Sequence, residues 1–305
     1  MSARTAAIVL HWRSVDEAME ALESAGTGAR RADLFIVVDH RGEPLDLQRL
    51  RARFPGIVVL EPGKNLGPAG GSNLAIAEAL ARGCSRVLLL NDDARLLPDT
   101  LARLEAALDA NPGAGMAAPL ILFAGEPERV WFGGGRIDWR SGATAHLHVG
   151  APPSEVPTGA PRVTDYFPGC VLLVNASLIG AIGAFDERYF IYFEETDWCE
   201  RARRAGFRLL FVPEARALHR VSGGDTYAAN PPKIYYFTRN RLLFMQRYRE
   251  GGLDARFHLA FARYLARVAW GIARRGGRRR LRSMRALVLG LRDFRAGRFG
   301  ERTDV

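Results

Sequence analysis

The sequence contains little cysteine and no long hydrophobic run. Its three cysteines, Cys84, Cys170 and Cys199, are too few for a disulfide framework or a metal cluster, so we expect buried thiols in a reducing compartment. No uninterrupted apolar stretch approaches the roughly 20 residues of a membrane-spanning helix. The amino terminus also lacks the long apolar core of a signal peptide. These absences predict a cytoplasmic protein without a membrane span.

Neither of the two common nucleotide-binding motifs is present. The glycine-rich segment NLGPAGGSNLAI, residues 65–76, lacks the Gly-Lys-Ser/Thr ending of a P-loop and the glycine spacing of the dinucleotide fingerprint. A glycine-rich turn that leads into a helix still lets backbone amides approach an anion closely. The alternative is a tight connection between a strand and a helix. This segment alone supports both interpretations equally.

Negative charge is scarce at the carboxyl end. Residues 239–305 contain 18 Arg, no Lys and five acids, whereas residues 1–238 are nearly neutral, so the net charge of +10 comes from the tail. The whole chain is 48% apolar and 25% charged, which is ordinary for a globular protein and argues against disorder. We therefore expect a globular domain over residues 1–228 and a helical, Arg-rich extension over residues 229–305.

Hydrophobic patterning in the first domain alternates between strands and helices, which is typical of an α/β fold with a mostly parallel central sheet. Ligands of such sheets bind at the carboxyl ends of the strands. Residues 114–165 are rich in Gly and Pro and predict short strands and loops, and residues 166–190 predict a strand followed by a short helix. Further strands are expected at residues 6–12, 32–40, 56–62, 85–93 and 207–213, and helices at residues 14–26, 71–83, 98–113 and 194–205.

The strand expected at residues 85–93 ends in Asn91, Asp92 and Asp93. Carboxylates at the end of a buried strand repel one another and resist desolvation, so a bound cation is one explanation. Because alternate residues of an extended strand point the same way, we expect Asn91 and Asp93 to face one side. An amide oxygen and a carboxylate there suit Mg²⁺ or Mn²⁺. The alternative is a helix N-cap, which Asp99 supplies instead.

Short motifs lie along the chain in a fixed order: VVDH (37–40), NLGPAGGSN (65–73), LLLNDDA (88–94), FPGC (167–170), FDERYFIYFEETDWCERARRAGF (185–207) and HRVSG (219–223). Over roughly residues 5–250 they resemble the family-2 glycosyltransferases of GT-A fold, in the bacterial rhamnosyltransferase-like and galactofuranosyltransferase-like branch. The resemblance implies a mostly parallel central sheet flanked by helices. It also implies inverting transfer of a sugar from a nucleotide-diphosphate donor to a hydroxyl of a glycan or lipid-linked acceptor. Rhamnose is the first candidate sugar, and galactofuranose is the alternative.

The resemblance further implies residues for the donor and metal sites. Asn91 and Asp93 take the two metal-facing positions of the family's Asp-x-Asp motif, and His219 matches a histidine that completes the metal shell. Mn²⁺ or Mg²⁺ is the implied cofactor. Asn91 departs from the commoner Asp, which leaves a non-catalytic sugar-nucleotide or glycan-binding module as an alternative. The implied nucleotide and donor ligands are Asp39, Asn65, Gly67, Asn73, Asp92 and Gly169.

The general base implied by the resemblance is Glu195, where the family more often has Asp. It lies in an acidic run with Glu194 and Asp197. Asp197 is the second catalytic candidate, and Glu194 and Trp131 are candidates for the acceptor site. The alternative for the acids is favourable charge at the amino end of a helix. The alternative for Trp131 is core packing at a turn.

The Arg-rich extension contains two basic amphipathic segments, residues 253–275 and 276–291. Such helices lie in a membrane interface, attracted by anionic lipid at ~1 kcal/mol per basic residue. We therefore expect peripheral association with the anionic inner face of the cell membrane, and packing on the first domain is the alternative. Nucleic acid is not an expected partner, because no recognised binding motif accompanies the charge. The first segment has a basic stripe of Arg256, Arg263, Arg267 and Arg274, and an apolar stripe of Phe257, Phe261, Leu265, Val268 and Ile272.

Overall fold

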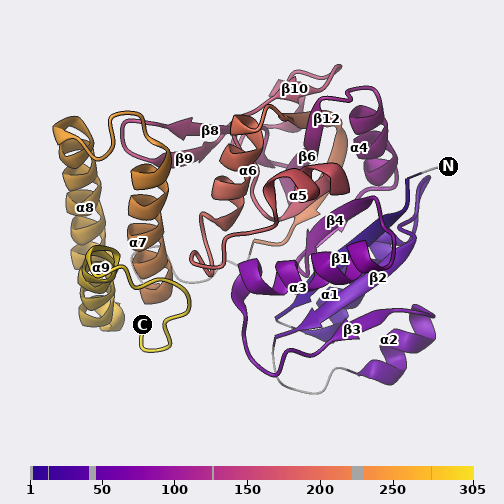
Figure 1. Cartoon of the computed structure of the whole chain (residues 1–305), viewed down its shortest axis with the longest axis horizontal. Coiled ribbons are helices and arrows are strands. Elements are labelled where there is room, and N and C mark those ends of the chain that lie inside the picture. Colours follow the sequence, from indigo (N-terminus) through magenta and orange to yellow (C-terminus); the bar gives the residue numbers. More distant parts are fainter. Residues whose placement is uncertain (1–2, 13, 41–45, 126, 222–229, 276) are drawn as a thin grey trace.

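The computed structural model describes residues 3–12, 14–40, 46–125, 127–221, 230–275 and 277–305. Within them, a ten-stranded sheet forms the centre of a mixed α/β domain, and helices pack against it (Figure 1). A group of three long helices from the carboxyl end stands beside this domain, away from the amino terminus (Figure 1). The strand order is β10-β12-β6-β11-β4-β1-β2-β3.

The amino-terminal half of the sheet is parallel, as the sequence predicted. Its strands are β1 (Thr5–His11), β2 (Leu34–Asp39), β3 (Val58–Leu60) and β4 (Arg86–Asn91). The register pairs β1 with both β2 and β4, and β2 with β3. The connecting helices are α1 (Val15–Ala25), α2 (Leu47–Arg53) and α3 (Gly67–Ala81), of which α2 was not anticipated. Apolar runs form β1, β2 and β4 because helices cover the sheet, and their side chains are almost all buried.

The other half of the sheet is mixed. It contains β6 (Ala114–Phe123), β11 (Val171–Asn175) and β12 (Arg208–His219), with β11 antiparallel to β4 and β6, and β12 parallel to β6. We expected only short strands and loops between residues 114 and 165, and this expectation was wrong for the ten-residue strand β6. Its Gly115 makes room for a neighbouring helix, since a Cβ there would lie 2.0 Å from Leu178 Cδ1. Its Pro119 lies where the register with β12 shifts.

The remaining elements surround this frame. The short strands β5, β7 and β10 pair at its margins, and β8 and β9 form a separate two-stranded hairpin. Their bounds are β5 (Ala94–Leu96), β7 (Val130–Phe132), β8 (Gly135–Asp138), β9 (Ala143–His146) and β10 (Arg162–Val163). The helical pieces are α4 (Thr100–Asp109), a 3-10 turn (Pro153–Glu155), α5 (Ala176–Ile182) and α6 (Glu194–Arg204).

The glycine-rich segment forms the start of α3 rather than a turn before it. We expected the helix to begin at residue 71, but it begins at Gly67, with Pro68 in its first turn. Gly67 has a φ of +66°, and a Cβ there would lie 2.5 Å from the carbonyl oxygen of Phe190. A Cβ at Gly71 would lie 2.4 Å from His40 Nε2. Glycine is therefore required here because two other parts of the chain approach the helix backbone.

The carboxyl-terminal extension is helical, as expected, and consists of α7 (Pro231–Tyr248), α8 (Ala255–Arg275), a 3-10 turn (Gly277–Arg279) and α9 (Arg280–Arg295). Leu242, Phe244 and Met245 of α7 belong to the same hydrophobic cluster as the sheet. The ring of Trp139, beside the β8–β9 hairpin, stacks on Phe244 at 5.6 Å. The expected boundary at residue 228 lies outside the described residues, and apolar packing joins α7 to the first domain.

The apolar stripe predicted for α8 faces inward. Phe257, Phe261, Val268 and Ile272 are buried, the first two in the main cluster and the last two in a smaller cluster shared with α7 and α9. No helix among the described residues is both long and apolar enough to span a bilayer. One face of α8 is therefore covered by packing within the protein, part of it against α7 and α9.

Candidate active site

Three polar residues lie where the parallel strands end. The register of β1 and β2 pairs His11 with Asp39, and the register of β1 and β4 pairs Leu10 with Asn91. Asp39 is buried at 6% exposure. The amide of Asn91 donates to the carbonyl of Cys170 at 2.9 Å, which brings Gly169 to the same edge. Asp39, Asn91 and Gly169 therefore gather at the carboxyl edge of the sheet, where ligands of such folds bind.

The acidic pair after β4 forms a turn into β5. Asp92 Oδ2 accepts a hydrogen bond from the amide of Trp12 at 3.0 Å, and Asp93 Oδ1 lies 3.1 Å from His219 Nε2. Asn91 is exposed, whereas Asp93 is not. Our expectation that an extended strand would turn Asn91 and Asp93 to one side was wrong in its premise, because residues 92 and 93 leave the strand. The pairing of β5 with β12, which sets Ala94 opposite His219, brings Asp93 to the histidine instead.

The helix-cap argument also needs correction. Asp99 occupies the N-cap position of α4, but its side chain makes no capping hydrogen bond there. The side chain of Asp99 therefore does not cap α4. For this reason, Asp99 gives no argument against a capping role for Asp93. The contact between Asp93 and His219 is a separate and stronger reason to assign Asp93 to the site.

Asp93 and His219 offer one oxygen and one nitrogen to a cation. Their side chains are only 7% and 11% exposed, and His219 Nδ1 is buried without a hydrogen-bond partner in the described part of the chain. Carboxylate and imidazole together suit Mn²⁺, and carboxylate oxygens suit Mg²⁺. No group of three His, Cys, Asp or Glu side chains suited to a metal occurs among the described residues. The pair therefore fits an ion whose other ligands come from phosphate oxygens and water.

Aromatic packing fixes the His219 ring. Trp131 of β7 meets it edge to face, with ring centroids 4.3 Å apart, and meets His146 in the same way at 4.6 Å. Burial lowers the pKa of His146, so this ring stays neutral at pH 7. Trp131 is half-buried in these contacts, which favours packing over the exposed stacking platform that we considered for it. His146 itself was missed, because nothing in the sequence sets it apart from a surface histidine.

The residues expected on the donor side are tied to other parts of the chain. Asn65 Oδ1 accepts from the amide of Gly67 at 2.8 Å. Asn73 bonds the backbone of Phe185 through both ends of its amide, at 2.8 and 3.0 Å, and also donates to Glu187. These contacts hold the start of α3 and fasten it to the segment before α6.

His40 lies directly after Asp39, one of the residues expected on the donor side, and the sequence analysis did not name it as a site residue. It is buried at 8% exposure, and its Nε2 has no hydrogen-bond partner among the described residues. Burial lowers the pKa of His40, against the opposing effect of Asp39. Its position directly after a strand-end carboxylate is the signal that could have identified it.

Glu194 and Glu195 begin α6 at the same edge of the sheet. A Cβ at Gly169 would lie 3.9 Å from Glu195 Cβ, so Glu195 stands beside the turn that adjoins Asn91. Glu194 is 8% exposed, and its Oε2 has no hydrogen-bond partner in the described ranges. Burial and then the charge of Glu195 raise the pKa of Glu194 well above its usual range, while burial raises the pKa of Glu195. Two adjoining carboxyl groups with raised pKa values resist carrying two negative charges at once.

The backbone that leads into α6 is strained. Phe190, Tyr192 and Phe193 have φ values of 64°, 65° and 74°, and none of them is glycine. A non-glycine residue in this left-handed region costs roughly 1–3 kcal/mol. Such conformations persist only where the surroundings impose them, so other parts of the chain must hold residues 190–193 in place.

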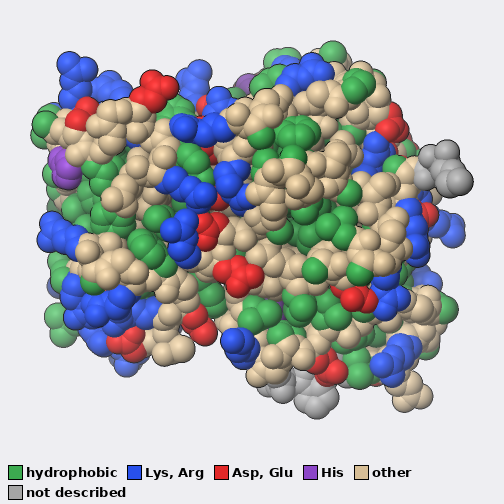
Figure 2. Space-filling view, in the orientation of Figure 1, with side chains coloured by type: hydrophobic (Ala, Val, Ile, Leu, Met, Phe, Trp, Pro, Cys, Tyr) green, Lys and Arg blue, Asp and Glu red, His purple; other side chains and the backbone are tan. Residues whose placement is uncertain are grey.

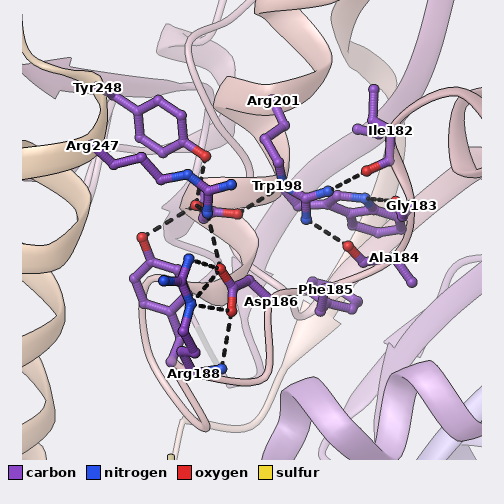
Figure 3. Close-up of polar contacts among 12 residues, drawn as sticks. Ile182, Gly183, Ala184, Phe185, Asp186, Arg188, Trp198, Arg201, Arg247 and Tyr248 are labelled. Atoms are coloured by element: carbon purple, nitrogen blue, oxygen red, sulfur yellow. Dashed lines mark hydrogen bonds and ion pairs between the residues drawn. The ribbon is translucent and has the colours of Figure 1, made fainter. Parts of the chain in front are cut away.

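Asp197 is fully buried. Its neighbours Arg201, Arg247 and Tyr248 point their polar groups toward one another in Figure 3. Its side chain is 0% exposed, and its Oδ1 accepts from the hydroxyls of Tyr189 at 3.1 Å and Tyr248 at 2.7 Å. Arg201 Nε donates to Oδ2 at 2.8 Å, and Arg247 donates to Oδ1 at 3.1 Å. Such burial does not agree with contact between Asp197 and a bound sugar, and therefore not with its place as the second catalytic candidate.

Several curated relatives of the chain are bacterial sugar transferases, although no family model matches it. It is 29% identical over 254 residues to an N-acetylglucosaminyl-diphospho-decaprenol L-rhamnosyltransferase of Mycobacterium tuberculosis, covering 72% of this chain and 79% of the relative. It is 30% identical over 259 residues to the galactofuranosyltransferase GlfT1 of the same species, covering 77% and 80%. The dTDP-rhamnosyl transferase RfbF of Shigella flexneri is 23% identical over 219 residues, covering 70% of each chain.

Solved structures with the same fold are also sugar transferases. GalNAc-T7 with UDP, GalNAc and Mn²⁺ superposes with a TM-score of 0.62 at 13% identity, covering 90% of this chain and 58% of that one. A mannosyltransferase from Pyrobaculum calidifontis with GDP-Man and Mn²⁺ gives 0.56 at 16% identity, covering 96% and 76%. The GT-A fold expected from the sequence is therefore confirmed.

Proposed function

Because the chain belongs to the family-2 glycosyltransferases, in the branch of rhamnosyl- and galactofuranosyltransferases, we propose that it is a metal-dependent, inverting sugar transferase. Its donor is a nucleotide-diphospho-sugar, and its acceptor is a hydroxyl of a glycan or of a lipid-linked saccharide. Rhamnose is the proposed sugar, and galactofuranose is the second candidate, favoured by the 30% identity to a galactofuranosyltransferase. The observation that carries the proposal is the placement of Asp93 with His219, and of Glu195 beside Gly169, at one edge of the sheet.

Asp93 and His219 hold the divalent ion of the donor diphosphate in this proposal. Bound there, the ion neutralises charge that accumulates on the departing nucleoside diphosphate. Asn91 lies at the end of β4, before the turn that carries Asp93, and supplies at most a neutral oxygen. The structural neighbours that contain Mn²⁺ support a divalent ion without fixing which one.

Glu195 takes the proton from the acceptor hydroxyl. In this proposal Glu194 stays protonated, because burial and the charge of Glu195 raise its pKa, so the pair carries one negative charge. A single carboxylate on the far side of the sugar from the leaving diphosphate is the arrangement that inversion requires. Gly169, beside Glu195, leaves space that a side chain would fill.

Three expected site residues receive other roles in this proposal. Asn73 fastens α3 to residues 185–187, and Asp197 holds α6 against α7. Trp131 supports the His219 ring at the rim of the site. The donor side keeps four of the expected residues: Asp39, Asn65, Gly67 and Asp92. A nucleotide bound there would lie close to backbone amides at the first turn of α3 and at the strand ends.

The metal assignment predicts that Asp93→Ala abolishes Mn²⁺-dependent donor binding. The change removes the only charged ligand that we assign, so we expect affinity for the preferred sugar nucleotide to fall about 100-fold or more, which is ~3 kcal/mol. A panel of UDP-, dTDP- and GDP-sugars is titrated calorimetrically, with Mn²⁺ and with EDTA, and turnover is measured on each.

Asp99→Ala is the matched control, since it removes a nearby carboxylate that makes no capping bond. Donor affinity that EDTA leaves unchanged in the wild type would contradict the metal site. Metal-dependent binding without turnover of any sugar nucleotide would favour the non-catalytic binding module.

We also propose that α8 and α9 place the enzyme on an anionic membrane surface. Figure 2 shows basic side chains, all of which are Arg in these helices, gathered over α8 and α9 with hydrophobic side chains between them. Trp270 of α8 is 61% exposed, and Leu281 and Val288 of α9 are 84% and 58% exposed. Leu281, Met284 and Val288 follow helical spacing, so they form one apolar stripe. Arginines and an exposed apolar stripe together match an anionic bilayer interface.

We expect the full chain to bind vesicles of phosphatidylglycerol and phosphatidylcholine, and to leave them at high salt. Replacing Arg278, Arg280 and Arg282 by Gln removes ~3 kcal/mol of attraction and should lower the partition coefficient about 100-fold. Replacing Arg31, Arg51 and Arg103, which are exposed on the first domain, is the control. Equal loss in the two triple variants, or preference for duplex DNA over vesicles, would exclude the proposed surface.

A further inference from the structure

A polar pair in the carboxyl-terminal extension holds the strained backbone in front of the catalytic carboxylates. The pair is Arg239 and Asn240 of α7, here called the clamp, and residues 188–193 are called the approach segment. Arg239 is 1% exposed and Asn240 is 0% exposed. Buried polar side chains require hydrogen-bond partners, and the partners of this pair lie mostly in the approach segment.

Asn240 binds the carbonyl oxygens of the approach segment. Its Nδ2 lies 2.9 Å from the oxygen of Tyr189, 2.9 Å from that of Ile191 and 2.7 Å from that of Tyr192. Arg239 Nε donates to Asn240 Oδ1 at 2.9 Å, which fixes the amide with its nitrogen toward the segment. One side chain thus holds three carbonyls of a stretch in which Phe190, Tyr192 and Phe193 have positive φ.

Arg239 uses the rest of its guanidinium in the same way. Nη2 donates to the carbonyls of Arg188 and Tyr189 at 3.1 and 3.0 Å, and Nη1 donates to the carbonyl of Gly300 at 2.8 Å. Nη1 also donates to the hydroxyl of Tyr235 at 3.1 Å. The amide of Gly300 in turn donates to the carbonyl of Arg188 at 2.8 Å. The clamp therefore ties the approach segment both to α7 and to the end of the chain.

The approach segment connects the two halves of the site. On one side, a Cβ at Gly67 would lie 2.5 Å from the Phe190 carbonyl, which also accepts from the amide of Ala69 at 3.3 Å, so the segment touches the start of α3. On the other side, Phe193 is the N-cap residue of α6, and Glu194 and Glu195 follow it directly. A shift of the segment would move Glu195 relative to the donor side.

We infer that Arg239 and Asn240 are positioning residues that set where Glu195 stands relative to the donor. They touch no reacting group and act through the approach segment. This inference rests on the proposed function, and it assigns to the carboxyl-terminal extension a role in the chemical step in addition to the membrane contact proposed for α8 and α9. Without the clamp, residues 190–193 relax from their positive φ values, and Glu195 is no longer held at the geometry that transfer needs.

The test uses Asn240→Ala in the full chain. Amide hydrogen exchange of the peptides that cover residues 186–197 is followed by mass spectrometry, and kcat and donor affinity are measured with the sugar nucleotide found in the donor panel. We expect exchange in the approach segment to be at least 10-fold faster, with the remaining peptides unchanged. We also expect kcat to fall 10- to 1,000-fold while the Kd of the donor changes less than threefold.

Asn175→Ala is the matched control, because Asn175 at the end of β11 is a partly buried amide that, like Asn240, bonds an arginine and a backbone carbonyl. It should lower stability without changing exchange in the approach segment or kcat. Arg239→Lys, which keeps the charge but loses the fork of donors, serves as a second variant if Asn240→Ala does not fold, with the same expected result.

Exchange in the approach segment that stays at the wild-type rate in both variants would overturn the inference. Faster exchange with unchanged kcat would also overturn it, since the segment would then be held for stability alone. A wild-type chain that turns over no sugar nucleotide overturns the proposed function instead. In that case the exchange result still decides whether the clamp holds the segment.

Discussion

Glu195→Gln should leave the fold and donor affinity intact and lower kcat by a factor of ~10²–10⁴, the range that a general base contributes. Glutamine keeps the shape and hydrogen bonds of Glu195 but cannot accept the proton of the acceptor hydroxyl. Steady-state kinetics with the donor and acceptor, together with calorimetric titration of the donor, measure the two effects separately. Because Glu194 and Gly169 remain in place, the variant tests the carboxylate of Glu195 itself and not its surroundings.

The pH dependence gives an independent check on the same residue. Burial raises the pKa of Glu195, and the base must be ionised to act, so kcat/KM should rise with pH through a pKa above the usual carboxyl range. Glu194→Gln removes the neighbouring carboxyl that shares its proton and should alter this pKa with a smaller loss of kcat. A Glu195→Gln enzyme with near-normal turnover would show that the base is another residue.

The sequence predicted the elements that local pattern determines. Continuous apolar runs predicted β1, β2 and β4, and helical periodicity predicted the apolar stripe of α8 that contains Phe257 and Phe261. It failed for β6, where Gly115 and Pro119 interrupt the pattern of a strand. Glycine fits at position 115 because Leu178 approaches the strand, and Pro119 lies where the register with β12 shifts. Both features depend on tertiary structure, which the local pattern does not show.

In the candidate site, too, the sequence predicted local features but not those that depend on tertiary contacts. The motif at residues 91–93 could be placed at a strand end, but its geometry depends on a turn and on the pairing of β5 with β12. The clamp was not predicted, although Arg239 and Asn240 belong to a four-residue polar run, residues 238–241, between two apolar runs of α7, which is itself a signal that can be read from the sequence. The backbone carbonyls that the pair binds lie 48 to 61 residues away in the chain, so no local pattern could identify them.

The network around Asp197 gives the second large effect that we expect. Asp197→Ala removes a fully buried carboxylate and leaves Arg201, Tyr189 and Tyr248 without their shared acceptor. Removing one member of a buried charged network costs ~3–5 kcal/mol, so the free energy of unfolding should fall by that amount. Urea denaturation of the full chain, followed by circular dichroism, measures it.

The control for Asp197 lies on the same helix. Glu200 is 4% exposed and pairs with Arg203 and Arg204, whose side chains are 35% and 50% exposed, so Glu200→Gln leaves cations that water can reach. Its cost should stay near 1 kcal/mol, because screened ion pairs contribute little. Asp197→Asn keeps the shape and distinguishes the two possible roles. If that variant unfolds at the wild-type urea concentration but transfers no sugar, Asp197 acts in catalysis and the structural assignment is wrong.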